Sequence, residues 1–192
     1  MKPGTVLAAV LVALGSASSV NADPVLLVNG SGVLIGAKNV LAGGTLYDVT
    51  FVDGTCIDVF EGCDAVSDFN FATFDDAAAA ANALLGQVFV DAPPAGNFDT
   101  HPELTLGCTD PSACFAAIPM GITGGGVVFG AVAYNSAADV LSNFNFLTDF
   151  DTSRDGQAVW AEFTPAQPVP EPASLVLLGS GLGILMRRRC KA

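Results

Sequence analysis

The sequence predicts an α+β fold, a mainly antiparallel β-sheet with one packed α-helix, plus an N-terminal signal peptide and a short C-terminal membrane helix. Three observations support this class. Glycine and alternating β-branched residues dominate the middle of the chain, and one alanine-rich segment has helical spacing. Both ends carry an apolar stretch next to basic residues. The roughly 150 residues between them suffice for one domain with its own core.

The N-terminus has the three parts of a secretory signal. Lys2 precedes an apolar run from Val6 to Leu14, and small residues follow. Val20 and Ala22 suit the positions three and one before a cleavage site. The apolar run is too short for a comfortable membrane span, which argues against an uncleaved anchor. We therefore predict a signal peptide over residues 1–22.

A β-hairpin is the first element expected in the exported acidic β-rich domain, residues 23–164. Apolar and polar side chains alternate in Thr45–Val52, as in a strand with one buried face. Gly43-Gly44 immediately before this segment supplies a tight turn. Val33–Ala42 and Thr45–Val52 are therefore expected to form an antiparallel pair, and Asp53-Gly54 ends the second strand.

One helix is predicted over Thr73–Val88. Thr73 suits the N-cap, and Asp75 and Asp76 fall in the first turn, where the helix dipole favours negative charge. The alanine run Ala77–Ala81 has high helix propensity. The apolar residues at helical spacing, expected to lie on the sheet, are Phe74, Ala77, Ala78, Ala81, Leu84, Leu85 and Val88.

Further strands are expected in the second half of the domain. Gly126–Tyr134 and Gln157–Phe163 are rich in valine and aromatic residues. Phe144–Phe150 is a candidate strand between them, with a short helix over Ala137–Ser142 as the alternative interpretation. A stiff, proline-rich tether at residues 165–168 follows the last strand.

The exported region is strongly acidic. The whole chain has 7 Lys and Arg residues against 19 Asp and Glu residues, a net charge of −12. Between the two ends, Lys38 and Arg154 are the basic residues that remain against all 19 acidic ones, which gives −17. Nucleic acid and anionic lipid both require cationic side chains, so neither is an expected ligand. A solubilising acidic exterior is the simpler interpretation, and a dedicated cation site is the alternative.

Four of the five cysteines form two close pairs in the sequence. In an oxidising compartment such cysteines are expected to be disulfide-bonded. Close sequence neighbours meet most readily, so we predict the local pairs Cys56–Cys63 and Cys108–Cys114. Zinc is the competing interpretation, but neither spacing is that of a zinc knuckle and the chain has one histidine. No metal site is predicted.

The C-terminal segment has three distinct parts. Val169-Pro170-Glu171-Pro172 leads into an apolar run at residues 173–186, and Arg187-Arg188-Arg189 follows. At about 1.5 Å per residue the run covers roughly 21 Å, less than the hydrocarbon layer of about 30 Å. We therefore predict a short membrane helix that anchors the chain only provisionally. The arginines favour the cytoplasmic side, which leaves the domain outside and keeps Cys190 in a reducing compartment.

These residues resemble the PEP-CTERM sorting signal of Gram-negative bacteria, which an exosortase, a membrane protease-transpeptidase, is thought to recognise and remove. The resemblance covers residues 169–192 and implies a sorting signal made by Pro170, Glu171, Pro172, Arg187, Arg188 and Arg189. It further implies export, an inner-membrane-anchored intermediate, and a final location in the cell envelope, at the surface or outside the cell. The segment Gly36–Cys56 also looks like one that recurs in uncharacterised exported PEP-CTERM proteins, for which no activity is known.

No catalytic constellation is evident in the sequence. His101 lies in turn-rich sequence, and there is no Gly-x-Ser-x-Gly elbow, P-loop or dinucleotide fingerprint. Asp149–Gly156 clusters oxygen ligands that suit calcium, but it lacks the ligand order of an EF-hand and is better read as an Asp-rich turn. The glutamates available for a glycosidase-type carboxylate pair are Glu61, Glu103 and Glu162.

The leading functional prediction is an exported, exosortase-sorted cell-envelope or exopolysaccharide-associated protein that is not an enzyme and uses no cofactor. Its expected partners are the exosortase and, through the transient C-terminal helix, the membrane, with exopolysaccharide as a further candidate. Nucleic acid is not an expected partner, given the charge of the domain. Two alternatives stay open: a calcium- or carbohydrate-binding adhesion module, and a secreted carboxylate-dependent hydrolase.

Overall fold

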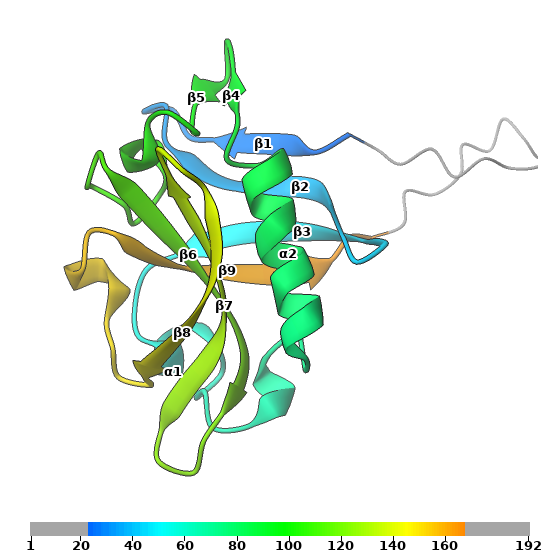
Figure 1. Ribbon diagram of the computed structural model, residues 1–192, viewed down its shortest axis with the longest axis vertical. Coiled ribbons are helices and arrows are strands. Elements are labelled where there is room, and N and C mark those ends of the chain that lie inside the picture. Colours follow the sequence, from blue (N-terminus) through cyan, green and yellow to red (C-terminus); the bar gives the residue numbers. More distant parts are fainter. Residues whose placement is uncertain (1–22, 168–192) are drawn as a thin grey trace, which may run out of the picture.

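The computed structural model of the chain describes residues 23–167. The predicted signal peptide and the predicted C-terminal membrane helix lie outside these residues. Seven strands form one sheet in the order β1-β2-β3-β9-β6-β7-β8 (Figure 1). Their bounds are β1 Val25–Val28, β2 Leu34–Ala42, β3 Thr45–Val52, β6 Ala113–Ile122, β7 Val127–Ser136, β8 Val140–Leu147 and β9 Ala158–Pro165.

The remaining elements are short except for one helix. They are α1 (Cys56–Val59), α2 (Phe74–Gln87), the small hairpin β4 (Asp91–Ala92) and β5 (Gly96–Asn97), and the 3₁₀ turns Val66–Asp68, Pro102–Leu104 and Thr152–Arg154. Within residues 23–167, no helix has both the length and the apolar character needed to cross a membrane.

The predicted hairpin is confirmed. Strands β2 and β3 pair antiparallel, and Ala42 lies opposite Thr45 across a two-residue turn. Gly43 and Gly44 both have positive φ, 56° and 84°, the backbone that a tight hairpin turn of this length requires. The alternation in β3 also holds, because Val49 and other residues of the same face are buried while Thr50 is exposed.

The predicted helix is confirmed as α2, with a small correction to its buried face. The hydroxyl of Thr73 accepts the backbone N–H of Asp76 at 3.2 Å and donates to its carboxylate at 2.6 Å. Phe74 was expected on the sheet but is 42% exposed. The buried face is instead formed by Ala77, Ala80, Ala81, Ala83 and Leu84. Phe74 is the first helical residue, and it lines a hollow together with Met120 of β6 and Phe129 of β7.

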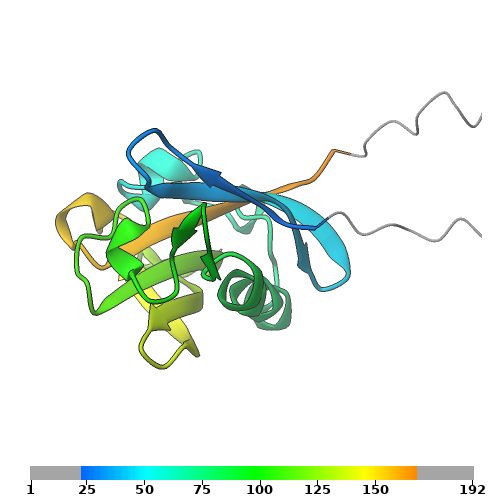
Figure 2. The same ribbon diagram turned by 90° about the horizontal axis from the view of Figure 1, so that it is seen from above.

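The sheet curls around α2. The helix packs against both β2 and β7, although three strands separate these two in the sheet. Figure 2 shows the same arrangement from above, with β1–β3 and β6–β8 on two sides of the helix. The small alanines of α2 allow this close approach, and the core beneath it includes Phe51 stacked on Phe89 at 5.5 Å between ring centroids.

Strand β6 was not predicted, although it lies near the middle of the sheet. Five of the six strand pairs in the sheet are antiparallel, and β6 pairs in parallel with β9. Its alanines are buried on both faces, which hides the period of two that identifies a half-buried strand. Pro119 also argues against a central strand, but it lies where the register with β7 shifts, the position that a sheet tolerates for proline.

The strand expected at Phe144–Phe150 begins earlier, because β8 covers Val140–Leu147. The alternative of a short helix over Ala137–Ser142 is therefore wrong. Side-chain hydrogen bonds form a turn there instead: the backbone N–H of Ser136 donates to Asp139 Oδ1 at 3.1 Å, and that of Ala138 donates to Ser136 Oγ at 3.3 Å. Such local bonds compete with helix formation.

Candidate functional site

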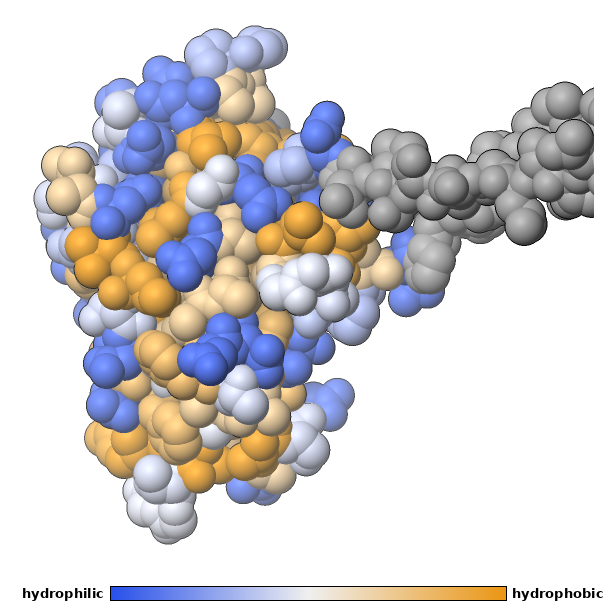
Figure 3. All heavy atoms as spheres, turned by 45° about the vertical axis from the view of Figure 1, so that its right-hand side comes forward, coloured by the Kyte–Doolittle hydropathy of each residue, from blue (hydrophilic) through white to orange (hydrophobic). Residues whose placement is uncertain are grey.

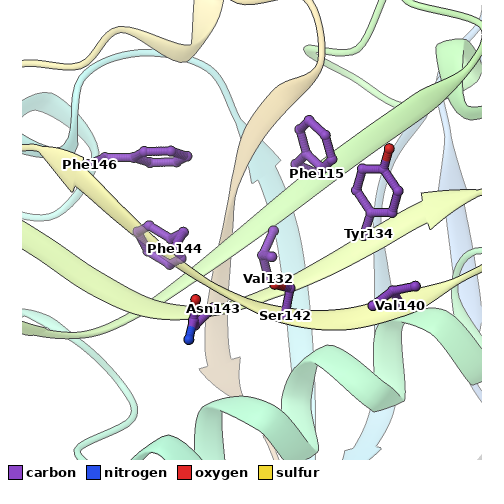
Figure 4. Close-up of a pocket in the computed structure, with 8 residues that line it drawn as sticks. All are labelled: Phe115, Val132, Tyr134, Val140, Ser142, Asn143, Phe144 and Phe146. Carbon is purple, nitrogen blue, oxygen red and sulfur yellow. The ribbon is translucent and has the colours of Figure 1, made fainter.

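An aromatic groove crosses strands β6, β7 and β8 on the face away from α2 (Figure 4). Its volume is about 450 Å³, within the range of small-ligand sites. The face of the sheet toward α2 is lined by alanines of β6 and β7, whereas the groove lies on the opposite face. The residues that line the aromatic groove are Phe115, Val132, Tyr134, Val140, Ser142, Asn143, Phe144 and Phe146.

Strand register explains why a groove forms here. Val132 of β7 lies opposite Ala117 of β6 on one side and Ser142 of β8 on the other, so a row of small side chains crosses the sheet. One row further along, the larger Phe115 and Tyr134 lie opposite each other. Figure 4 shows Val132 and Ser142 between two groups of aromatic rings. The groove is therefore a row of small residues between two aromatic walls.

The first wall is a stacked pair from neighbouring strands. The rings of Phe115 and Tyr134 have centroids 4.3 Å apart and an interplanar angle of 20°. Both side chains are partly exposed. Offset stacking of this kind stabilises aromatic pairs beyond their buried area, so the wall has a defined position before any ligand arrives.

The second wall, formed by Phe144 and Phe146, packs against the buried ring of Trp160. Phe144 and Phe146 have centroids 4.8 Å apart and lie 5.8 and 5.9 Å from the ring of Trp160. Trp160 is fully buried, and its indole Nε1–H donates to the carbonyl oxygen of Gly54 at 3.0 Å. Phe60 contacts the same indole edge-on at 5.6 Å. The second wall is thus the edge of a small core, in which Phe144 is buried and Phe146 is partly exposed.

The chemistry of the groove is neutral. The hydroxyls of Tyr134 and Ser142 are its side-chain hydrogen-bonding groups, because Asn143 lines it from β8 but lies opposite Ala131 on the α2 side of the sheet, and no carboxylate or basic group lines it. This neutrality contrasts with residues 23–167 as a whole, which contain 18 acidic and two basic residues. On the face of the molecule drawn in Figure 3, hydrophilic side chains lie between the apolar areas. The arrangement can hold an uncharged ligand that presents apolar faces and polar edges.

The predicted cysteine pairs are both joined in the structure. Cys56 is bonded to Cys63 and Cys108 to Cys114, with Cα–Cα distances of 5.7 and 5.6 Å. The first pair belongs to the same buried cluster as Trp160, so it helps to fix the core behind the second aromatic wall. The second pair fixes the loop that enters β6.

The three glutamates considered for catalysis lie on separate elements, and His101 lies beside one of them, Glu103. Nδ1 of His101 is 3.0 Å from Glu103 Oε1, and the histidine side chain is 53% exposed in its loop. Glu61 follows α1, whereas Glu162 lies on β9. Five hollows on the described surface contain at most one carboxylate each, from Asp68 in one and Asp99 in another.

The segment Asp149–Gly156 forms a turn whose carboxylates bind its own backbone and side chains. Asp151 Oδ1 accepts from the hydroxyl and the backbone N–H of Ser153, and Arg154 Nε lies 3.0 Å from Asp151 Oδ2. The Ser153 hydroxyl is the main reason that the pKa of Asp151 is below its usual value. In residues 23–167, no three His, Cys, Asp or Glu side chains are grouped so that they could hold a metal ion.

Sequence reasoning missed the aromatic groove. Alternation in Ser142-Asn143-Phe144-Asn145-Phe146 is a signal that could have placed Ser142, Phe144 and Phe146 on one face. The opposite wall could not be assigned in the same way, because β6 was not recognised. Without its register against β7, nothing in the sequence brings Phe115 next to Tyr134.

The domain presents the groove away from the end of the described chain. The backbone N–H of Ala166 donates to the carbonyl oxygen of Leu46 at 2.9 Å, so the chain leaves β9 beside β3. In Figures 1 and 2 the strands β6–β8 lie on the other side of the domain from that point. The predicted sorting residues at positions 170–172 and 187–189 follow beyond it, outside the described residues.

Comparison with known proteins identifies the segment that follows the domain. A family model for the PEP-CTERM protein-sorting motif matches residues 168–189. This range contains Pro170, Glu171 and Pro172 as well as the basic cluster Arg187–Arg189. No curated protein and no solved structure matches the chain. The chain thus carries a PEP-CTERM sorting motif, which supports export and sorting by an exosortase through a membrane-anchored intermediate.

Proposed function

We propose that this protein is a non-enzymatic component of the cell envelope or of the exopolysaccharide outside it, delivered by the exosortase route. The sorting motif at residues 168–189 is the observation that carries the proposal. It supports export of the chain and an exosortase as its processing partner. In the membrane-bound stage, the apolar run at residues 173–186 holds the chain, with Arg187–Arg189 on the cytoplasmic side.

The described domain suits such a destination. Its two disulfides are of the kind that persist in oxidising compartments. Its net charge of −16 over residues 23–167 keeps copies apart and soluble. The aromatic groove is on the side away from the exit of the chain, so the domain can use it both while it is anchored and after release.

The geometry of the groove supports holding rather than catalysis. General acid–base chemistry needs a proton donor and an acceptor close to the reacting bond. The lining of the groove offers two aromatic walls and two hydroxyls, with no carboxylate or histidine among them. The proposal therefore favours a binding protein over the carboxylate-dependent hydrolase.

The test is cell fractionation of the full chain in a Gram-negative host that carries an exosortase and makes exopolysaccharide. The wild type should pass through the membrane fraction and then accumulate in the envelope or with the released polysaccharide. The triple variant Pro170→Ala, Glu171→Ala, Pro172→Ala should stay in the membrane fraction with its tail uncut. Gln167→Ala, just before the motif, is the matched control and should behave as the wild type.

Two results would contradict the proposal. Recovery of the intact wild type from the cytosol, with free thiols, would contradict export of the protein. Turnover of polysaccharide by the purified chain would remove the non-enzymatic role while leaving the sorting route in place.

A further inference from the structure

We propose that the aromatic groove is a binding site for a neutral glycan. The inference rests on the proposed function and deepens it, because it names the class of ligand and the residues that contact it. Contact would come from the two aromatic walls, Phe115–Tyr134 and Phe144–Phe146, with Ser142 between them.

The shape of the groove matches the two surfaces of a sugar ring. A pyranose has apolar C–H faces and polar hydroxyl edges, so an aromatic ring contacts its face while hydrogen-bonding groups contact its edge. The walls provide the aromatic rings, the stacked pair Phe115–Tyr134 on one side of the small-residue row and the tilted pair Phe144–Phe146 on the other. Tyr134 and Ser142 provide hydroxyl groups at the same place. Mostly apolar lining with a few polar groups is typical of small-ligand sites.

Charge narrows the class of ligand. An anionic polymer is repelled by a domain with a net charge of −16 and meets no basic side chain in the groove. A cation is attracted instead to the carboxylates elsewhere on the surface. A second copy of the chain carries the same charge, which opposes pairing through this face. A neutral ligand is the one that the groove accepts without an electrostatic cost.

The groove is open at the edge of the sheet, which suits a polymer. Strand β8 is the last strand of the sheet, and its Val140 is 48% exposed at the end of the groove. The row Ala117–Val132–Ser142 runs across the strands toward that edge. A glycan chain lying along this row can continue past β8, whereas a peptide strand would add along the edge, perpendicular to the groove.

The experiment is affinity electrophoresis of the full-length chain in non-ionic detergent. The acidic chain migrates toward the anode at neutral pH, and a soluble polysaccharide in the gel retards it if they bind. The neutral probes are β-1,3-glucan, xylan and galactomannan, and alginate is the anionic comparison. The emission of Trp160 gives a second readout, because its ring contacts both aromatics of the second wall.

Two variants change the groove in different ways. Tyr134→Ala removes half of the first wall, and we expect binding to weaken roughly three- to tenfold. Ser142→Trp fills the small-residue row from an exposed position and should abolish retardation without disturbing the core. Phe74→Ala is the matched control, because it removes an exposed aromatic ring outside the groove. Thermal unfolding shows whether each variant is folded.

Retardation by at least one neutral polymer, lost in Ser142→Trp and kept in Phe74→Ala, is the expected result. The proposal is overturned if no neutral polymer retards the chain, if alginate retards it equally, or if Ser142→Trp binds as well as the wild type. If the wild type self-associates with increasing concentration and Ser142→Trp does not, the groove binds a second copy of the chain, and the glycan proposal is also overturned. Ser142→Trp should be exported and processed like the wild type in the fractionation experiment. A failure of the glycan proposal can therefore be distinguished from a failure of the proposed sorting route.

Discussion

The indole Nε1–H of Trp160 donates a hydrogen bond to the carbonyl oxygen of Gly54 at 3.0 Å, although 106 positions separate the two residues in the chain. Gly54 follows β3, and its carbonyl oxygen also accepts the backbone N–H of Thr152 at 3.0 Å. Three distant segments therefore meet at one backbone oxygen. Because the same indole supports Phe144 and Phe146, this contact ties the end of the hairpin to the wall of the groove.

The first prediction concerns this contact. Trp160→Phe removes the hydrogen bond and leaves a void under the second wall, so the free energy of unfolding should fall by about 2–4 kcal/mol. Denaturant unfolding followed by circular dichroism measures it. Tyr134→Phe, which keeps a stacked ring and removes only a hydroxyl from a partly exposed residue, should change stability by less than about 0.5 kcal/mol. Equal stability of Trp160→Phe and the wild type would show that the indole is not a structural support.

A second prediction concerns the close approach of β6 and β7. A Cβ added at Gly130 would lie well inside contact distance of the carbonyl oxygen of Ile118, which belongs to the neighbouring strand. Gly130→Ala should therefore lower the free energy of unfolding by about 2–3 kcal/mol or more. Gly124→Ala is the control, because a Cβ there meets nothing within 4 Å. Denaturant unfolding of both variants should separate them, and a similar small effect for each would contradict the register described here.

How far the sequence predicts the fold depends on how much of each element faces solvent. Strand β3 and helix α2 each have one buried and one exposed face, so periodicity and turn or cap residues identify them. Strand β6 is buried at seven of its ten positions and contains Pro119, so neither signal is present. Its place beside β9 is set by tertiary packing, which the local pattern does not contain.

The same limit applies to the candidate site. The sorting motif is a contiguous run with distinctive chemistry, so Pro170-Glu171-Pro172 is recognisable without any structure. The aromatic groove instead joins Phe115, Tyr134 and Phe144 from three strands. Its existence depends on cross-strand register, since a shift of one residue would turn these rings to the other face.

A third prediction concerns the disulfides. Non-reducing peptide mapping of the exported chain should find Cys56 joined to Cys63 and Cys108 joined to Cys114. Removing either pair by double substitution to serine should lower the free energy of unfolding by about 2–3 kcal/mol, because the unfolded chain regains its freedom. A disulfide between a cysteine of one pair and a cysteine of the other would contradict the structure. Reduction of the disulfides without loss of stability would contradict their predicted contribution to the free energy of unfolding.

A fourth prediction concerns pH. Burial raises the pKa of Asp53 above its ordinary value of 3.8; a hydrogen bond from Thr152 opposes this shift, and the nearby carboxylate of Asp151 adds a smaller increase. A raised folded-state pKa means that the charged form is disfavoured by folding, so this group's contribution to stability improves as pH falls through that pKa. Asp53→Asn should therefore have a higher free energy of unfolding than the wild type at pH 7. On acidification toward pH 4, its free energy of unfolding should increase less than that of the wild type.

The matched variant acts in the opposite direction. Thr152→Val removes the hydroxyl that lowers the pKa of Asp53, so its pH dependence above pH 4 should be steeper than that of the wild type. Below that range Asp110 has the opposite effect on stability. Hydrogen bonds from Ser112 lower the pKa of Asp110, so their contribution to stability is lost when the carboxylate is protonated. Unfolding midpoints measured from pH 3 to 7 test both signs, and identical curves for the three proteins would contradict the assignment to Asp53.

A fifth prediction concerns the cationic end of the sorting motif. Replacing Arg187, Arg188 and Arg189 with glutamate reverses the charge that holds the tail on the cytoplasmic side. This variant should lose stable membrane retention and escape normal processing, as measured by fractionation. Replacing the same residues with lysine keeps the charge and should preserve retention. Unchanged retention and processing of the glutamate variant would contradict the role of charge.

The most direct measurement is the intact mass of the full chain recovered from envelope fractions of matched hosts with and without the exosortase. We predict that the chain loses its C-terminal tail, including Arg187–Arg189, only in the host that has the enzyme, while both disulfides are present in each sample. An identical mass from the two hosts, with the tail either kept in both or cut in both, would contradict exosortase sorting of this protein.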